Sequence, residues 1–210
     1  MVVITPEYNH PKELSLANEM LARGLPLLHI RKPYWTFEQL EHWVEKISYQ
    51  HQDRLVIHIP TPVINNCLKV FKQYSRLINS IKAQYAHLST ENCSLVNNYM
   101  SELPYLSTSV HNSTESKQLS TRHRRAFLSP VFTSISKRGY HPTIDWTSIL
   151  QAWEFPWIQT VALGGITPEY IPIIQAQGFD DFAVLGAIWQ AQEPLKIFDL
   201  CHNQDHLFFP

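Results

Sequence analysis

Eight short runs of β-branched and apolar residues recur along this chain of 210 residues, and they constrain its fold more than any other feature. The runs cover residues 2–5, 27–31, 55–59, 84–88, 105–110, 126–132, 158–163 and 182–185. Most of them are separated by amphipathic stretches such as 37–47, where apolar residues recur every three or four positions, as in a helix. Alternating strands and helices predict parallel strands, because each return to the same edge of a sheet needs a crossover helix.

Eight such units predict one TIM-type (β/α)8 barrel, an α/β fold, in a single domain over residues 1–210. An open doubly wound sheet is the alternative. The chain contains no internal repeat, low-complexity segment or domain linker. The element boundaries within 61–104 are the least defined, because 61–81 is longer than one short helix requires and 92–104 is weak as a helix.

Charge and cysteine content exclude several classes of protein. The 17 basic and 18 acidic residues nearly balance, so no general field attracts nucleic acid or an acidic membrane. Cys67, Cys93 and Cys201 are widely spaced and odd in number, which argues against a disulfide framework and a zinc knuckle.

The first residues do not resemble a signal peptide, and no apolar run reaches ~18 residues. We expect a cytoplasmic protein without nucleic-acid or membrane partners, and the aromatic content is consistent with a homo-oligomer.

Three of the six glycines, Gly164, Gly165 and Gly186, directly follow the seventh and eighth predicted strands. In (β/α) barrels the loops after these strands often bind phosphate through backbone N–H groups, which glycine lets the anion approach. The alternative interpretation is a tight turn into a helix, with Thr167 as N-cap and Pro168 at the first helical position. Both interpretations can hold together.

A second candidate phosphate site follows the sixth predicted strand. Ser134, Ser136 and Lys137 offer two hydroxyl groups and one ammonium group within four residues, which suits phosphate oxygens. The alternative is an ordinary solvated loop. Arg31, at the end of the second predicted strand, is a candidate for binding a carboxylate or phosphate, with a salt bridge at the barrel rim as its alternative.

Four histidines, His29, His58, His87 and His111, fall toward the C-terminal ends of predicted strands two to five, which face the mouth of a barrel. Imidazole groups there can act as acids or bases, bind a metal, or form a hydrogen-bonded wall. The chain has no H-x-H or H-E-x-x-H motif and few acidic residues beside these strand ends, so we expect no metal site.

Several segments together resemble the thiamine phosphate synthase/TenI family of small (β/α) barrels in thiamine biosynthesis. Residues 29–33, HIRKP, are similar to the family motif Q-x-R-E-K, residues 85–88, YAHL, to G-V-H-L, and residues 107–111, STSVH, to S-x-H. Residues 128–137, LSPVFTSISK, are similar to G-P-V-F-x-T-x-T-K, and VALGGITPE and VLGAI are similar to A-I-G-G-I-T and V-S-A-I. The resemblance implies that the two glycine loops and the 134–137 loop bind the phosphate of a small thiazole substrate.

The departures from the family pattern bear on the reaction. Family synthases join a pyrimidine diphosphate to a thiazole phosphate, using Mg²⁺ held by an Asp in I-N-D-R and an Asp in G-Q-E-D. Here these segments read IHIP at 57–60 and STEN at 89–92, so neither aspartate is present. The resemblance then implies the TenI branch, which tautomerises a thiazole carboxylate phosphate to its aromatic form without a cofactor.

The resemblance also implies residue roles. His111 matches the TenI catalytic histidine, while His29, Arg31 and His58 are predicted to contact the substrate, with Arg31 holding its carboxylate. Two alternatives stay open: a synthase, which would require Mg²⁺, and a non-catalytic binder or regulator.

Overall fold

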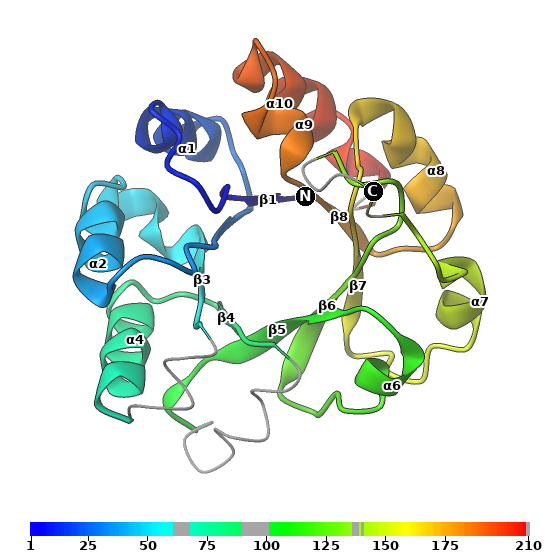
Figure 1. The fold of residues 1–210 in the computed structure, drawn as a ribbon, viewed down its shortest axis with the longest axis horizontal. Coiled ribbons are helices and arrows are strands. Elements are labelled where there is room, and N and C mark those ends of the chain that lie inside the picture. The colour runs from blue at the N-terminus through cyan, green and yellow to red at the C-terminus, as the bar shows by residue number, and fades with distance from the viewer. Residues whose placement is uncertain (61–67, 90–100, 136–138, 140, 209–210) are drawn as a thin grey trace.

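Eight parallel strands close into a barrel in the computed structural model, which describes residues 1–60, 68–89, 101–135, 139 and 141–208 (Figure 1). The strands are β1 (Val2–Ile4), β2 (Leu27–Ile30), β3 (Leu55–His58), β4 (Tyr85–His87), β5 (Tyr105–Val110), β6 (His123–Leu128), β7 (Gln159–Leu163) and β8 (Asp181–Val184). Each strand pairs with its neighbours in chain order, and β1 pairs with β8. The predicted (β/α)8 barrel is confirmed.

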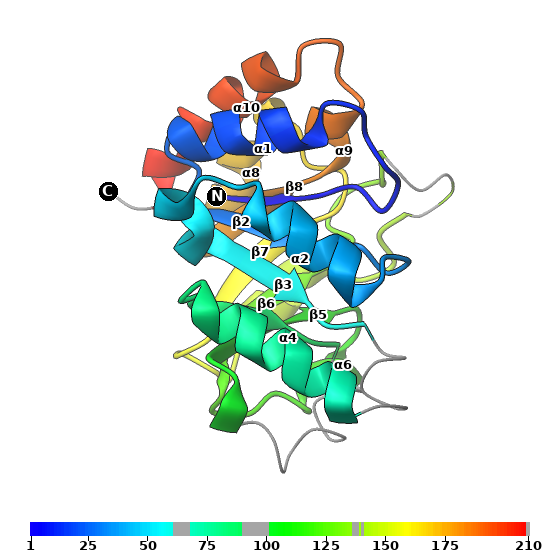
Figure 2. The same cartoon turned by 90° about the vertical axis from the view of Figure 1, so that its left-hand side faces the viewer.

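Helices cover the outside of this barrel (Figures 1 and 2). The α-helices are α1 (Glu13–Ala22), α2 (Phe37–Glu45), α4 (Leu68–Ser80), α6 (Ser113–Ser116), α7 (Trp146–Gln151), α8 (Ile171–Ala176), α9 (Gly186–Trp189) and α10 (Pro194–His202). Short 3-10 helices are η1 (Tyr49–Arg54), η3 (Pro168–Tyr170) and η4 (Asp205–Leu207). Helix α2 illustrates their sequence logic, because Thr36 and Gln39 form a capping box at its start and Leu40 and Val44 are buried on one face.

Two apolar layers hold the fold together. The larger one lies between the barrel and its helices and includes Phe71, Phe182 and Phe198. The smaller one fills the barrel itself, and its residues are Val2, Ile4, Leu27, Val56, Phe127, Val161 and Ala183. Because side chains fill the interior of a small barrel, a ligand has to bind at one end of it.

Strand β6 differs from its sequence prediction of 126–132, since it starts at His123 and ends at Leu128. The earlier start includes Arg125, whose charge is accommodated by a buried ion pair with Asp181. The earlier end precedes Pro130, which has no N–H group to donate to a neighbouring strand. The prediction missed this because it followed apolar side chains alone.

The region 61–104 contains the other departures. A helix was expected within 61–81, and α4 forms its second part. Residues 61–67 and most of 92–104, with Cys67 and Cys93, lie outside the described residues. Cys201 is a free, buried thiol on α10. Among the helices that the structure describes, none combines the length and apolar character needed to cross a membrane.

Candidate active site

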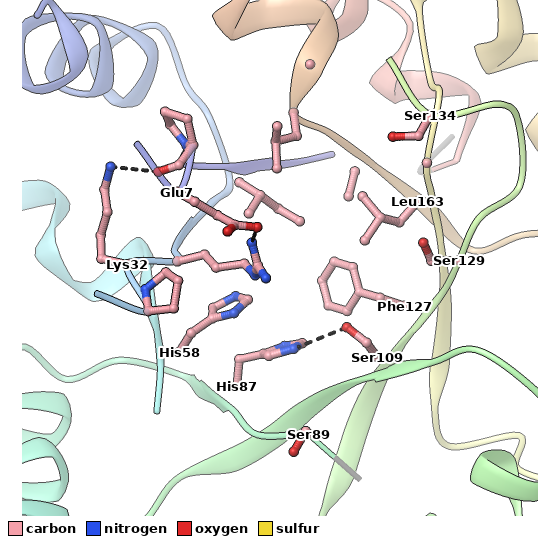
Figure 3. A pocket seen from close by; sticks show the side chains of 18 of the residues that line it. Glu7, Lys32, His58, His87, Ser89, Ser109, Phe127, Ser129, Ser134 and Leu163 are labelled. Carbon is pink, nitrogen blue, oxygen red and sulfur yellow. Dashed lines mark hydrogen bonds and ion pairs between the residues drawn. The ribbon is translucent and has the colours of Figure 1, made fainter. Parts of the chain in front are cut away.

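A pocket of about 1120 Å³ opens at the C-terminal ends of the barrel strands. Its wall is shown in Figure 3, where His58 and His87 lie side by side and face Phe127 and Leu163 across the pocket. A volume of this order accommodates a small organic ligand. The pocket lies at the end where the sequence places its candidate residues.

The glycine loops form one side of the pocket, where Gly164, Gly165 and Gly186 all line it. Gly164 and Gly165 have φ angles of 101° and 68°, in the region that favours glycine. A Cβ atom on Gly164 would lie 2.9 Å from Cα of Pro130, and one on Gly165 would overlap the carbonyl oxygen of Thr133. Both the backbone turn and the close packing therefore require glycine at these two positions.

The residues beside these glycines bear on the tight-turn interpretation, while the phosphate-site interpretation stays a prediction. Thr167 stands at the N-cap position of η3 and Pro168 is its first residue, although the Thr167 side chain makes no capping hydrogen bond. Ser134 also lines the pocket, and it directly follows Thr133, whose carbonyl oxygen packs against Gly165. Ser136 and Lys137 lie outside the described residues, so their predicted phosphate contacts stay predictions.

His111 directly follows β5 and lines the pocket with 48% of its side chain exposed. Its Nδ1 atom lies 3.1 Å from Oε2 of Glu115, and its backbone N–H donates to the same oxygen at 2.8 Å. Because an ionised carboxylate only accepts hydrogen bonds, Nδ1 is the donor in this contact, and in the neutral imidazole Nε2 then carries the lone pair. This tautomer is the one that a general base at Nε2 needs.

Glu115 is a pocket residue that the sequence reasoning missed. Asn112 caps α6 by accepting a hydrogen bond from the Glu115 backbone N–H, and its side-chain amide donates to Glu115 Oε1 at 2.8 Å. The carboxylate is therefore held from both sides, by Asn112 and by His111. The available signal was Asn112 followed three residues later by Glu115, a spacing typical of helix N-termini.

The other three strand-end histidines meet inside the barrel mouth. His29 Nδ1 lies 3.1 Å from His58 Nε2, and the rings of His58 and His87 are stacked with centroids 3.9 Å apart. His58 and His87 line the pocket, whereas His29 is completely buried and lies behind them. His29 can therefore influence a pocket ligand only through its neighbours, and not by the direct contact expected from the sequence.

Burial keeps these three imidazoles neutral. Removal from water lowers the pKa of His29 and His58 well below 6.5 and that of His87 to about 3. Positive or protonatable neighbours lower these pKa values further, with Arg31 acting on both His58 and His87. At neutral pH the cluster offers lone pairs and N–H groups but no positive charge.

Arg31 lines the pocket and forms an ion pair with Glu7, another pocket residue that was not singled out from the sequence. Both side chains are about one-third exposed, at 35% and 33%. The neighbouring Lys32 is instead buried, and its ammonium group binds Glu13 at 2.6 Å and the Pro6 carbonyl at 2.7 Å. Among the residues that the structure describes, Arg31 is thus a guanidinium group that a pocket anion can reach.

The described residues of this pocket do not fit Mg²⁺. Its carboxylates in this part of the chain are Glu7 and Glu115, and both are engaged by other side chains. Buried Ile59 stands where the resemblance places the first aspartate, and it offers no oxygen. A hard cation such as Mg²⁺ needs several oxygen ligands in octahedral geometry. Glu91 and Asn92, at the second motif, lie outside the described residues.

Comparison with known proteins gives a family match. Residues 1–188 match the family model described as thiamine monophosphate synthase. No curated protein sequence matches the chain.

Several solved structures share the fold. Thiamine phosphate pyrophosphorylase from Bacteroides thetaiotaomicron is 22% identical, with a TM-score of 0.71 and coverage of 99% of this chain and 96% of that chain. Thiamine phosphate pyrophosphorylase from Pyrococcus furiosus is 14% identical, with a TM-score of 0.72 and coverage of 100% and 96%. A 3-hexulose-6-phosphate synthase from Salmonella typhimurium is 13% identical, with a TM-score of 0.69 and coverage of 99% of both chains. At these identities the likeness concerns the fold alone.

Proposed function

The chain belongs to the thiamine monophosphate synthase family, and we propose that within it the protein is a tautomerase that converts a thiazole carboxylate phosphate to its aromatic form. The observation that carries this proposal is the His111–Glu115 unit on the pocket wall. It supplies an oriented imidazole whose Nε2 lone pair is available for proton transfer.

The proposed reaction moves one proton. His111 Nε2 accepts a proton as it leaves the thiazole ring carbon, and the same nitrogen returns a proton to the exocyclic carbon, so the overall charge is unchanged. While His111 is protonated, the Glu115 carboxylate 3.1 Å from Nδ1 stabilises the imidazolium. Glu115 acts through His111 and is a positioning residue.

The rest of the pocket supports binding of such a substrate. Gly164, Gly165 and Gly186 leave only backbone facing a phosphate group on one side, next to the Ser134 hydroxyl. Arg31 offers a guanidinium group for the substrate carboxylate, which would compete with Glu7. Separate sites for the two charged ends would hold the ring between them, within reach of His111.

The synthase reaction is the second candidate, because the family model and two of the solved structures carry that activity in their names. Coupling a pyrimidine diphosphate releases diphosphate, whose charge Mg²⁺ normally neutralises. The donor set of the described pocket residues disfavours this ion, which is why we rank tautomerisation first.

Turnover of the non-aromatic thiazole carboxylate phosphate, followed by ultraviolet absorbance without added metal, tests the proposal. We expect rapid aromatisation by the wild type and a ~10²–10⁴-fold loss of kcat in His111→Ala, since general acid–base catalysis is worth about that much. Glu115→Gln should lower kcat by ~10–100-fold and change its pH profile, because the imidazolium loses its partner charge.

A matched control is His42→Ala, which removes an exposed imidazole from α2 and should leave turnover unchanged. Absence of turnover by the wild type would reject the tautomerase. Mg²⁺-dependent coupling of both substrates would then assign the synthase reaction, and binding of the thiazole phosphate without any turnover would assign a non-catalytic binder.

A further inference from the structure

The histidine cluster at the base of the pocket is not used by the proposed proton transfer. Three adjacent strands contribute one residue each: His29 from β2, His58 from β3 and His87 from β4. In the strand register, His58 of β3 pairs with His87 of the adjacent β4, and His29 of β2 pairs with Val56 of β3. Since Val56 and His58 are two residues apart, they share the inward face of β3, so all three imidazoles point into the barrel.

The three rings offer nitrogen atoms at metal-ligand spacing. One ring nitrogen from each histidine lies within 4.8 Å of the other two. The 3.1 Å between His29 Nδ1 and His58 Nε2 is close to the ~3.3 Å that separates two ligands of a tetrahedral ion with Zn–N bonds of about 2.0–2.1 Å. The His58 and His87 rings are stacked, so convergence of all three lone pairs on one ion requires these two rings to rotate out of the stack.

The hydroxyl groups of Ser107 and Ser109 contact the two ring nitrogens of His87 and fix the orientation of its imidazole ring. Ser107 Oγ donates its proton to the Ala86 carbonyl and lies 3.0 Å from His87 Nδ1. A lone pair of Ser107 Oγ therefore accepts the hydrogen bond that His87 Nδ1–H donates. The Nε2 lone pair of His87 then faces the pocket, toward Ser109 Oγ (Figure 3). A second hydrogen bond that fixes the tautomer of a ligand histidine is a regular feature of metal sites.

Carboxylates neutralise the positive charges of arginine side chains around the cluster, which reduces the repulsion of a bound cation. Two guanidinium groups in the described part of the barrel that act on these histidines are both paired with carboxylates, Arg31 with Glu7 and Arg125 with Asp181. His58 and His87 line the pocket, so a fourth position beside them is open to a pocket ligand. Three imidazoles and one open position favour a borderline-soft divalent ion such as Zn²⁺ or Co²⁺, and not Mg²⁺.

We propose that His29, His58 and His87 form a three-imidazole site for a divalent transition-metal ion of the Zn²⁺ type, whose fourth ligand position opens into the pocket. The fourth ligand is water or an oxygen of the pocket ligand. This site is separate from the His111–Glu115 unit, and its occupancy does not depend on the proposed tautomerase activity.

Titration of chelator-treated full-length protein with Co²⁺ alone tests the site, because tetrahedral Co²⁺ bound to nitrogen ligands absorbs visible light. We expect one ion per chain, no displacement by excess Mg²⁺, and displacement by one equivalent of Zn²⁺. His58→Gln and His87→Gln should each weaken binding by at least ~100-fold, and Ser107→Ala by ~10–100-fold through loss of orientation.

His42→Gln is the matched control, since it removes an exposed histidine on α2 and should leave the Co²⁺ titration unchanged. X-ray absorption of the Zn²⁺-loaded wild type gives a test that needs no variant, and we expect three imidazole nitrogens at about 2.0–2.1 Å. Absence of binding, binding unaffected by the cluster variants, or a spectrum without imidazole ligands would overturn the proposal. No substrate is present in either experiment, so failure of the tautomerase proposal cannot produce these outcomes.

Discussion

Individual side chains in the pocket fall into two groups, those held by a charged partner and those kept neutral by burial. Arg31 and His111 belong to the first group, since Glu7 and Glu115 hold them. His58 and His87 belong to the second. This division matters for function, because the first group can respond to a charged substrate and the second can donate lone pairs.

Arg31→Lys tests the proposed role of the guanidinium group. Lysine keeps the positive charge but loses the planar pair of N–H donors that matches a carboxylate. We expect KM for the thiazole carboxylate phosphate to rise by about 10-fold, equal to ~1.4 kcal/mol of binding. Binding of a thiazole phosphate that lacks the carboxylate, measured by calorimetry, should stay the same, and an equal loss for both ligands would contradict the assignment.

Cys201 should be chemically inert in the folded protein. Burial raises the pKa of its thiol to about 12, and only the thiolate reacts with alkylating reagents. At pH 8 the Cys201 peptide should remain unmodified by iodoacetamide, as measured by mass spectrometry. The same protein unfolded in guanidinium chloride is the control and should be labelled, whereas rapid labelling of the native protein would show that α10 opens readily.

Elements of the barrel differ in how they contribute to the site. Strand ends supply side chains, as β3 and β4 do with His58 and His87, while the loops after β7 and β8 supply backbone. The loop after β7 is additionally locked against the segment after β6, because Phe132 N–H donates to the Gly164 carbonyl at 3.0 Å. Exact backbone placement therefore depends on contact between two loops.

Gly165→Ala tests the contact between the loop after β7 and the segment after β6. The added Cβ would overlap the Thr133 carbonyl at a φ of 68°, so we expect a loss of ~1–3 kcal/mol in the free energy of unfolding and weaker substrate binding. Gly178→Ala is the matched control, with a φ of 91° but open space around its Cβ. It should cost less, about 1 kcal/mol, and leave binding unchanged. Urea unfolding and calorimetry of both variants provide the measurement, and equal losses would argue against the steric explanation.

The two ends of the barrel differ in the whole molecule: the C-terminal ends of the strands line the pocket, and the N-terminal ends carry buried polar groups. Opposite the pocket, buried Arg125 and Asp181 link β6 to β8, and His123 is buried at the start of β6. Ser120 N–H donates to His123 Nδ1 at 3.0 Å, so this imidazole is held as a neutral acceptor. Polar groups at the barrel base therefore contribute to stability in a pH-dependent way.

His123 predicts part of the acid sensitivity of the fold. Burial lowers its pKa below 6.5, so the unfolded chain takes up a proton more readily than the folded one, and stability falls as the pH drops below about 6.5. His123→Gln removes this titration. Its free energy of unfolding should depend on pH less steeply than that of the wild type, by up to ~1.4 kcal/mol per pH unit below 6.5.

Urea unfolding of both proteins from pH 7.5 to pH 5 measures this difference. The other buried histidines are present in both proteins and cancel in the comparison. Parallel pH curves for the two proteins would mean that His123 is protonated equally in the folded and unfolded states.

Local patterns in the sequence determined the barrel fold and the position of several residues at the C-terminal ends of its strands. Apolar runs alternating with amphipathic stretches predicted the closed parallel barrel, and the family resemblance is confirmed by the match over residues 1–188. Gly164, Gly165 and Gly186 could be placed at the pocket because position after a strand is a property of the chain alone. Strand β6 was misplaced because its buried charge has a partner 56 residues away.

Tertiary structure alone decided which side chains meet. Strand register brings His29, His58 and His87 together from positions 29 residues apart, although no metal-binding motif links them in sequence. The pairing of Glu7 with Arg31 likewise depends on how the loops after β1 and β2 lie side by side. Periodicity records which face of an element is buried, but register and loop packing set the distances between elements, and hydrogen bonds and metal ligands act only at those distances.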